Sequence, residues 1–462
     1  MNPRRLERRD KGRRSEDNSS ELNRPVSADY ERNVREINRE LGVPDNFDVV
    51  LREIVLDGKR VAIYSLNGLV NEQVSSMLVQ ALLDLESAEL LSATLERLVA
   101  AHIGTLQVSY VETLDKFYYF LLSGPLAIIV EGEERAIIVD LRVYPGRSPE
   151  EPDLERVTRG ARDGFTESLV TNTALIRRRL RDPKLRLHMA QVGSRSKMDV
   201  CLLYIEDITN LDLVRSIQEE IQKIKIDGIP MAEKSVEEFI LGSKPWNPYP
   251  RVRYTERPDV AAIHLLEGHV VIVADTSPSV MIAPATFWHH TQHAEEYRQE
   301  PVVGAFLRLI RFWGIFISVF LTPVWLAAAL NPQFLPDALG WLNGQNPAKI
   351  GLFWQVLLAD LGVDLVRMAA IHTPSPLATA LGLIAAFMIG DVAIDVGLFA
   401  PEVILITAFA AVGTFATPSY EFSLANKLVR LFLIIMTGLG NFIGLGIGTL
   451  AVFVMLVCTK SF

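Results

Sequence analysis

The sequence has little cysteine: Cys201 and Cys458 are the only two among 462 residues. Two distant cysteines cannot form the disulfide framework of a small secreted scaffold, so their scarcity fits a reducing compartment. The N-terminus also lacks the features of a signal peptide, because no apolar stretch follows the arginine-rich residues 1–14. We therefore expect the polar part of the chain to stay in the cytoplasm.

Charged residues are rare in the C-terminal third of the chain. From Pro301 to the end there are seven basic and seven acidic side chains, so this region has no net charge. The first 300 residues carry the whole net charge of −9. A polar region joined to an apolar one excludes a purely soluble enzyme and an intrinsically disordered chain. It predicts a soluble domain followed by a membrane domain.

The polar region has the residue pattern of an α/β fold. Alternating apolar and β-branched residues predict strands at 60–66, 126–130, 136–141, 185–192 and 198–205. Helical spacing of apolar residues predicts helices at 72–100, 165–180, 211–224 and 236–241. Residues 47–56 have a helical or mixed pattern, and 260–265 with 269–274 have the pattern of a hairpin turning at Glu267 and Gly268.

The fold class that follows is an α/β cytoplasmic region of two small α/β subdomains, followed by an all-α multi-pass transmembrane domain. The basic, polar start of the chain has too few apolar residues to order itself and is predicted to be a disordered tail. The expected segments are this tail at 1–45, the first subdomain at 46–144, the second at 145–280, a juxtamembrane amphipathic helix at 281–304 and the membrane domain at 305–462.

The apolar region contains several stretches close to the length of about 20 residues that crosses a bilayer. They are residues 312–330, 350–370, 376–390, 403–420 and 431–459, the last of which is either one span or a tight hairpin. Arg308 and Arg311 precede the first stretch, and Lys427 and Arg430 precede the last. Because basic residues stay on the cytoplasmic side, both stretches begin inside, which favours five membrane helices over four.

Several long runs of sequence resemble one protein family. They are GPLAIIVEGEERAIIVDLRVYPGR from Gly124 to Arg147, then SPEEPDLERVTRGARDGF, NTALIRRRLRD, PYPRVRYTERPD and LLEGHVVIVADTSPSVMIAP. In order and content they are similar to the A-subunits of spore germination receptors, over roughly residues 45–462. The stretch HHTQHAEEYRQ, which leads into RFWGIF, most resembles the stage V sporulation branch of that family.

The resemblance implies a multi-pass inner-membrane protein of bacterial spores that promotes germination. Such A-subunits resemble the oligomeric, channel-forming part of a nutrient receptor. The implied partners are further copies of the chain, other germination proteins of the spore membrane, and monovalent cations that pass through a pore between subunits. A non-conducting scaffold that organises germination receptors is the alternative. A transporter would require inverted repeats, and the apolar region displays none.

Four aspartates in the apolar region are candidate pore or gate residues, because ionisable groups in a membrane are costly and mark ion pathways. Asp360 and Asp364 are four residues apart and share one helix face, and Asp391 and Asp395 repeat that spacing. A ring of carboxylates formed by oligomerisation would attract cations. Two alternatives stay open: Asp360 or Asp364 pairs with Arg367, and the second pair lies in the headgroup layer.

Three glycines are candidates for close helix packing. Gly440, Gly444 and Gly448 recur every four residues within the last apolar stretch. Small residues at this spacing let two helix backbones approach each other. The approach is expected either within the chain or between subunits.

A basic cluster is a candidate for contacts between domains or subunits. Arg177, Arg178 and Arg179 are consecutive, and no aromatic side chains interleave with them, which argues against nucleic acid. The acidic residues Glu150 and Glu151 lie nearby in the sequence. We expect pairing of these charges within one protomer or between two.

The sequence offers no catalytic, cofactor or metal constellation. It has no phosphate-binding glycine loop, no GxSxG and no CxxC motif, so we expect neither an enzyme nor a cofactor. His289 and His293 would share one helical face, but no further ligands complete a tetrahedral metal site. We expect an amphipathic helix here, with Phe287 and Trp288 at the membrane interface.

Overall fold

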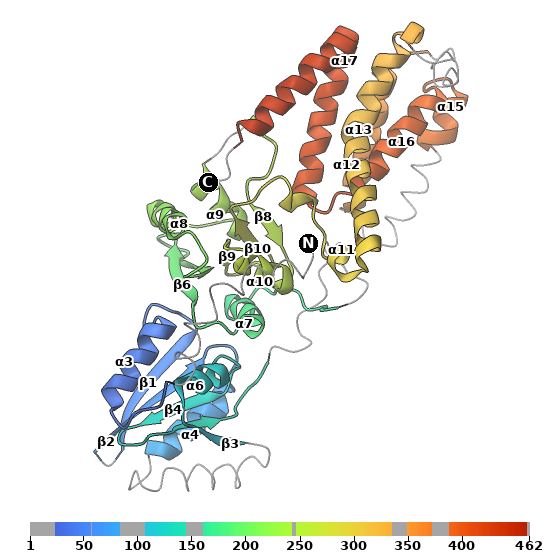
Figure 1. Cartoon of the computed structure of the whole chain (residues 1–462). Coiled ribbons are helices and arrows are strands. Elements are labelled where there is room, and N and C mark those ends of the chain that lie inside the picture. The colour runs from blue at the N-terminus through green and yellow to red at the C-terminus, as the bar shows by residue number, and fades with distance from the viewer. Residues whose placement is uncertain are drawn as a thin grey trace, which may run out of the picture. The chain divides into compact units, whose positions relative to one another are not determined.

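The structure is a computed structural model that describes residues 24–56, 58–83, 107–144, 160–242, 246–334, 349–371 and 388–459. It divides into two compact units (Figure 1). The α/β unit comprises Met1–Asp153, Ala161–Gly242 and Tyr254–Ala283. The helical unit comprises Leu154–Gly160, Ser243–Arg253 and Pro284–Phe462.

The α/β unit contains two five-stranded sheets. The first half consists of α3 (Tyr30–Leu41), β1 (Val49–Leu56), β2 (Lys59–Leu66), α4 (Glu72–Leu83), β3 (Val108–Val111), α6 (Leu114–Leu121), β4 (Leu126–Val130) and β5 (Ala136–Val139). The second half consists of α7 (Leu169–Arg179), β6 (Leu185–Val192), β7 (Met198–Ile205), α8 (Leu211–Lys223), α9 (Ala232–Leu241), β8 (Arg253–Thr255), α10 (Pro258–Leu266), β9 (Val270–Ala274) and β10 (Val280–Ala283).

The two halves have the same topology. The first sheet has the strand order β1-β2-β4-β5-β3 and the second has the order β6-β7-β9-β10-β8, so each strand has a counterpart at the same place. Helices α3 and α7 precede the first strand of each half, and α6 and α10 follow the third. The α/β unit is therefore a tandem structural repeat, which the apolar patterns alone do not reveal.

The first helix of each half begins with the same hydrogen-bonded arrangement. The Asn33 amide donates to the carbonyl oxygen of Ser27 at 2.6 Å and accepts from the Ser27 N–H at 3.0 Å. The Asn172 amide makes the same two bonds with Thr166, at 2.6 and 2.7 Å. Each asparagine lies four residues after the N-cap of its helix, which is Asp29 in α3 and Ser168 in α7. Both amides are buried, and they fix how the chain enters the helix.

Most predicted strands are confirmed, because their apolar residues meet the core. β4, β6 and β7 coincide with the predicted ranges, β2 begins one residue earlier than expected, and β5 ends two residues earlier. Every residue of β4 is buried, because it lies between β2 and β5 and because α3 and α6 cover one face of the sheet while α4 covers the other. Cys201 is also buried, in β7.

Three expectations for the α/β unit are wrong. The predicted disordered tail 1–45 contains α3, whose apolar side chains Tyr30, Val34, Ile37 and Leu41 share one buried face between many charged residues. Residues 47–56 form the strand β1, paired with β2 along its whole length. Residues 260–265 belong to helix α10, which Pro258 starts, and β9 pairs with β10 instead.

The helical unit begins with irregular structure where one amphipathic helix was expected. Residues 281–304 include the end of β10, the short turn η2 (His289–Thr291), α11 (Ala294–Arg298) and the start of α12 (Pro301–Ala329). Pro301 occupies the first turn of α12, where its missing N–H costs nothing. The remaining elements are η3 (Pro332–Phe334), α13 (Leu352–Ile371), the π-helical η5 (Met388–Val392), α15 (Ala393–Asp395), α16 (Pro401–Phe415) and α17 (Tyr420–Val457).

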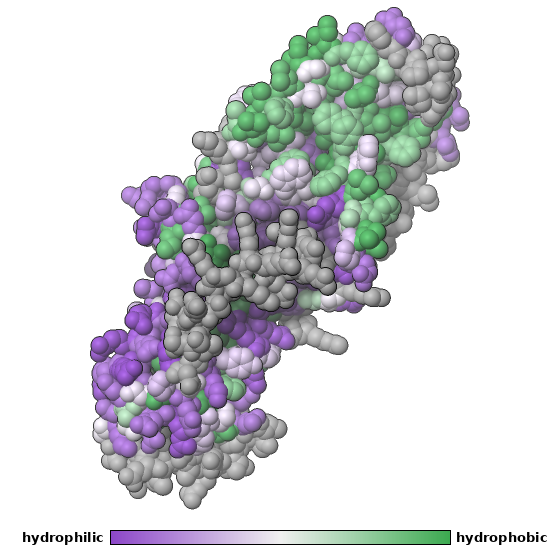
Figure 2. Space-filling view, viewed as in Figure 1, coloured by the Kyte–Doolittle hydropathy of each residue, from purple (hydrophilic) through white to green (hydrophobic). Residues whose placement is uncertain are grey.

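Two helices in the described part of the chain, α12 and α17, are long and apolar enough to cross a membrane. Figure 2 shows hydrophobic residues gathered over the helical unit, whereas the α/β unit is mainly hydrophilic on this face. The predicted stretch 376–390 lies largely outside the described residues. The number of membrane spans therefore stays a prediction.

Helix α17 folds back on itself in the middle. Asn441 has the non-helical backbone angles φ 51° and ψ −135°, and the two arms of α17 meet there at the end of the helical unit (Figure 1). Gly448 lies against Leu433, where an added Cβ would be 3.0 Å from the leucine side chain, although fifteen positions separate the two residues. The arms, 420–440 and 442–457, are about 31 and 24 Å long at the usual helical rise. The hairpin alternative for this stretch is the one observed.

Candidate functional site

Two acidic residues of α13 face two basic residues of α17 inside the helical unit. Arg430 Nη2 lies 2.7 Å from Asp360 Oδ1, and Lys427 pairs with Asp364 one turn away. The side chains of Asp360 and Arg430 are 1% and 2% exposed. The two aspartates are four residues apart on α13, and the two basic residues are three apart on α17. Because the helices run antiparallel, each aspartate meets one basic residue.

Arg430 also ties this pair to two further helices. Its Nη1 donates to the Ser318 carbonyl of α12 at 2.9 Å and to the Thr414 hydroxyl of α16 at 3.2 Å. The same atom lies 3.4 Å from the Ala410 carbonyl of α16. A planar guanidinium with several donors is suited to such a junction. One side chain therefore links α12, α13, α16 and α17.

The open alternative that paired an α13 aspartate with Arg367 is wrong. The Arg367 guanidinium instead lies over the rings of Phe415 and Tyr420, at 5.3 and 5.5 Å from their centroids. The partners of the aspartates are Lys427 and Arg430, which sequence reasoning used to orient the last span. Their spacing of three residues on one helix face was the signal that could have identified them.

The second pair of aspartates occupies a different environment. Asp391 lies in η5 and Asp395 in α15, and both side chains are exposed. The chain leaves α15 through Gly397, whose φ of 71° ends the turn. The structure thus brings Asp360 and Asp364 together with cations and leaves Asp391 and Asp395 at the surface of the helical unit. Their role at a pore stays a prediction.

Two of the three candidate glycines pack inside the α17 hairpin. A Cβ added at Gly444 would collide with the Met436 carbonyl oxygen, and one added at Gly448 would crowd the side chains of Leu433 and Met436. Gly440 lies beside the bend, with no atom within 4 Å of an added Cβ. Of the two expected kinds of approach, the one seen here is within the chain.

The arginine cluster makes contacts within the chain. Arg177 is buried and binds both carboxylate oxygens of Asp48, at 2.5 and 3.1 Å, and also donates to the carbonyl of Leu185. It therefore links the two halves of the α/β unit. Arg178 lies 4.4 Å from the ring centroid of Tyr144, and Arg179 binds Asp163 at 2.6 Å. Glu150 and Glu151 lie outside the described residues.

The segment before α12 carries a buried carboxylate and a buried histidine. Glu296 pairs with Arg308 at 3.0 Å and also with Arg311, and its side chain is 1% exposed. The His290 ring stacks on Phe422 at the start of α17, with centroids 5.9 Å apart. Burial, together with the nearby Arg253 and His289, lowers the pKa of His290 to about 3. His293 caps α11 through its Nδ1.

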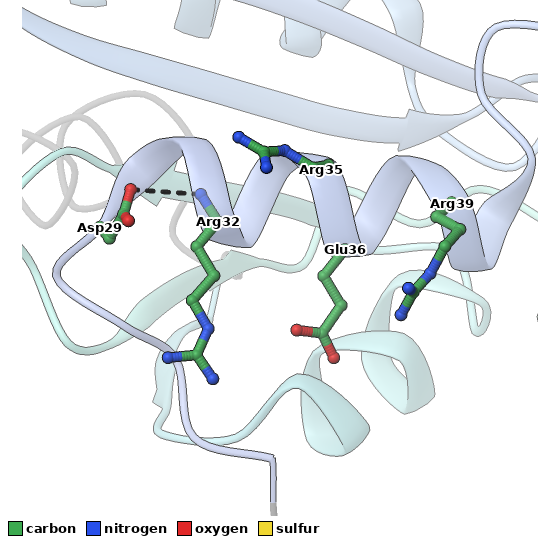
Figure 3. Close-up of a pocket in the computed structure, with 5 residues that line it drawn as sticks. All are labelled: Asp29, Arg32, Arg35, Glu36 and Arg39. Carbon is green, nitrogen blue, oxygen red and sulfur yellow. Dashed lines mark hydrogen bonds between the residues drawn. The ribbon is translucent and has the colours of Figure 1, made fainter.

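A shallow hollow on α3 is rich in arginine. Asp29, Arg32, Arg35, Glu36 and Arg39 line it (Figure 3). The Asp29 carboxylate accepts from the Arg32 backbone N–H as the helix cap, and Glu36 lies 3.4 Å from Arg24. Arg32, Arg35 and Arg39 are exposed. This hollow was not predicted from the sequence, because these residues were expected to belong to a disordered tail.

Comparisons with known proteins agree on one family. Residues 35–462 match the family described as Bacillus/Clostridium GerA spore germination protein. The chain is 50% identical over 421 residues to Stage V sporulation protein AF of Bacillus subtilis (strain 168), covering 91% of this chain and 85% of that protein. It is 30% identical over 455 residues to Spore germination protein KA of the same organism, covering 96% and 82%.

One solved structure is also similar. It is the crystal structure of the N-terminal domain of the A subunit of the Bacillus megaterium spore germinant receptor GerK3. The match has 29% sequence identity and a TM-score of 0.44, and it covers 57% of this chain and 98% of that one.

Proposed function

We propose that this chain, which belongs to the GerA family of spore germination proteins, is a multi-pass protein of the spore inner membrane that conducts ions during germination. The relatives are named for spore germination or sporulation, which supports the physiological role. Arg308 and Arg311 at the start of α12 support a cytoplasmic position for the α/β unit. The proposal assigns movement of ions and no bond-making reaction.

The observation that carries the ionic part is the pairing of Asp360 with Arg430 and Asp364 with Lys427 inside the helical unit. Each charge placed in a bilayer costs about 2.5–3.5 kcal/mol on insertion scales, so such residues commonly mark ion pathways. When Arg430 and Lys427 move away, the carboxylates of Asp360 and Asp364 become available to bind a mobile monovalent cation.

Assembly into a homo-oligomer is part of the proposal. One face of α13 exposes large apolar side chains at helical spacing: Trp354, Leu358, Leu361, Leu365 and Met368. In a membrane such a face contacts either lipid or another helix. Further copies of this chain and other germination proteins of the spore membrane are the proposed occupants.

The test is conduction by the purified full-length chain in planar bilayers under a K⁺ gradient. The wild type should conduct, and Asp360→Asn should change the conductance several-fold. Asp212→Asn, which changes an exposed carboxylate of α8 in the α/β unit, is the control and should behave as wild type. A silent wild-type protein, together with normal germination of spores carrying Asp360→Asn, would overturn the proposal.

A non-conducting scaffold is the second candidate. The observation in its favour is that Asp360, Asp364, Lys427 and Arg430 neutralise one another within one chain. The mass of the detergent-solubilised complex separates the candidates. A closed homo-oligomer supports the channel, whereas a monomer bound to other membrane proteins supports the scaffold.

A further inference from the structure

Three rings from two separate segments surround Phe422 in the first turn of α17. The centroid of the Tyr249 ring lies 5.5 Å from that of Phe422, and the centroid of Phe287 lies 5.1 Å from it. The His290 ring stacks on Phe422 at 5.9 Å. Phe422 is 1% exposed, so its side chain is enclosed by protein. The start of α17 is therefore fixed by side chains that are distant from it in the sequence.

Hydrogen bonds add to this cluster and extend it to the other arm of α17. The Tyr249 hydroxyl donates to Asn426 Oδ1, in the second turn of the helix, at 3.2 Å. The Asn247 side-chain amide donates to the Thr459 hydroxyl, just after the end of α17, at 2.8 Å. Residues 246–253 are therefore bonded to the beginning of the first arm and to the end of the second.

Arg253 joins residues 246–253 to the second segment, residues 284–293. Its side chain is buried, and its Nη1 donates to the carbonyl oxygen of His289 at 2.9 Å. Its Nη2 lies 3.5 Å from the carbonyl oxygen of Gln292. A planar guanidinium with several donors is suited to hold two stretches of backbone together. The two segments therefore form one body at the start of α17.

Both segments are continuous with strands of the α/β unit. Residues 246–253 lead into β8, and residues 284–293 follow β10. These two strands are neighbours at one edge of the second sheet, where β8 is the outermost strand. A rearrangement of that edge consequently acts on both segments through the covalent chain.

Helix α17 connects this cluster to the buried ion pairs. Lys427 and Arg430 follow Phe422 by five and eight residues on the same arm, which is about 8 and 12 Å along the axis at the usual helical rise. They pair with Asp364 and Asp360 of α13. Packed helices shift as whole elements. A shift of the first turn of α17 therefore moves both basic side chains relative to their aspartates.

We propose that residues 246–253 and 284–293 are a coupling joint through which the second sheet of the α/β unit controls the ion pairs between α13 and α17. In the conformation seen here the joint holds α17 where both pairs are formed. Rearrangement of the β8–β10 edge displaces Phe422 and releases Lys427 and Arg430 from the aspartates. That release permits conduction, a step that rests on the proposed function, whereas the coupling of the sheet edge to α17 does not.

The coupling is tested by hydrogen exchange of the full-length, detergent-solubilised protein. Val280→Ala loosens β10, and Val200→Ala is the matched control in β7, a strand that leads into neither segment. Both valines are fully buried, so both changes remove the same packing. We expect amide exchange of residues 420–430 to be at least threefold faster with Val280→Ala than with Val200→Ala. Equal exchange, or faster exchange with Val200→Ala, overturns the joint.

Tyr249→Phe tests the joint itself without creating a cavity in the sheet. The change keeps the ring beside Phe422 and removes only the hydroxyl that binds Asn426. If the joint connects β10 to α17, the effect of Val280→Ala on residues 420–430 should fall to less than half in the Tyr249→Phe background, because coupled changes are not additive. An undiminished effect shows that the strand acts on α17 by another route, and the joint is then wrong.

The control of conduction is tested by K⁺ flux into vesicles that contain the full-length chain. A loosened joint lets the ion pairs open more often, so we expect Tyr249→Phe to raise the flux at least threefold. Tyr204→Phe, which changes a tyrosine of β7 outside both segments, should stay close to wild type.

The outcomes of this flux measurement separate the joint from the proposed function. If the wild type conducts and Tyr249→Phe conducts equally, the joint does not control conduction, and the proposed function stands. If neither protein conducts, the proposed function fails. The exchange measurements then still decide whether the joint couples the sheet edge to α17.

Discussion

Arg430 and Asp360 form an ion pair of 2.7 Å between α17 and α13, with both side chains almost completely buried. Arg430 is at the same time hydrogen-bonded to α12 and α16. The pair is therefore the point at which the four longest helices in the described part of the helical unit are joined. Removing either partner leaves the other charge buried and uncompensated, which is the costly way to break such a pair.

The first prediction concerns the stability of this junction. Asp360→Ala should lower the free energy of unfolding by about 3–5 kcal/mol, because Arg430 then keeps its charge in an apolar interior. Asp395→Ala removes an exposed carboxylate from the same unit and should change it by about 0.5 kcal/mol or less. Denaturant unfolding in detergent measures both. Equal effects would show that Arg430 is solvated, contrary to the packing described.

The second prediction concerns Arg177 and Asp48, which link the two halves of the α/β unit. Arg177→Met should lower the free energy of unfolding by about 3–5 kcal/mol, because Asp48 loses its only bidentate partner in the described structure. Hydrogen exchange of the full-length chain should show weaker amide protection in β1 and β6. The neighbour Arg178, which stacks on Tyr144, provides the control: Arg178→Met should leave protection of those strands nearly unchanged.

The third prediction uses the tandem repeat. Asn33→Ala leaves the backbone N–H and carbonyl of Ser27 without their side-chain partner. Asn172→Ala does the same to Thr166. Each change should lower the free energy of unfolding by about 1–3 kcal/mol, the usual cost of unsatisfied buried groups. Asn210→Ala, which removes an exposed N-cap of α8, should cost about 1 kcal/mol or less. A large effect in only one half would contradict the equivalence of the two arrangements.

The fourth prediction is a pH dependence caused by His290. Its pKa in the folded protein is about 3, below the value of about 6.5 for an unfolded histidine, so folding disfavours the protonated form. The contribution of the neutral ring is complete above pH 6.5 and is lost as the pH falls from 6.5 toward 3. Between pH 6.5 and pH 4 the loss should reach about 3 kcal/mol.

His290→Phe isolates this contribution from other titrating groups. Phenylalanine keeps the stacking on Phe422 but binds no proton. The difference in unfolding free energy between wild type and variant should therefore grow in favour of the variant below pH 6.5. A difference that is constant from pH 7 to pH 4 would show that His290 is solvated in the folded state.

Several features of the fold and the site follow from local sequence. Strands β2, β4, β6 and β7 were predicted because a half-buried or buried strand imposes a pattern within a few residues. Asp360 and Asp364 stood out because charges are rare in the apolar region. Residues 47–56 and 260–265 were misassigned, since short apolar runs fit a helix and a strand equally well and the partner strand decides between them.

The sequence by itself determined that a charged α/β region precedes an apolar helical one, and which few charges the apolar part retains. Only the tertiary structure decided that Arg430 and Lys427 neutralise the α13 aspartates, that α17 turns back at Asn441, and that the α/β unit repeats one topology. The physical reason is the range of the interactions. Hydrophobic periodicity is a property of neighbouring residues, whereas an ion pair across 70 residues or a sheet order exists only after distant segments have packed together.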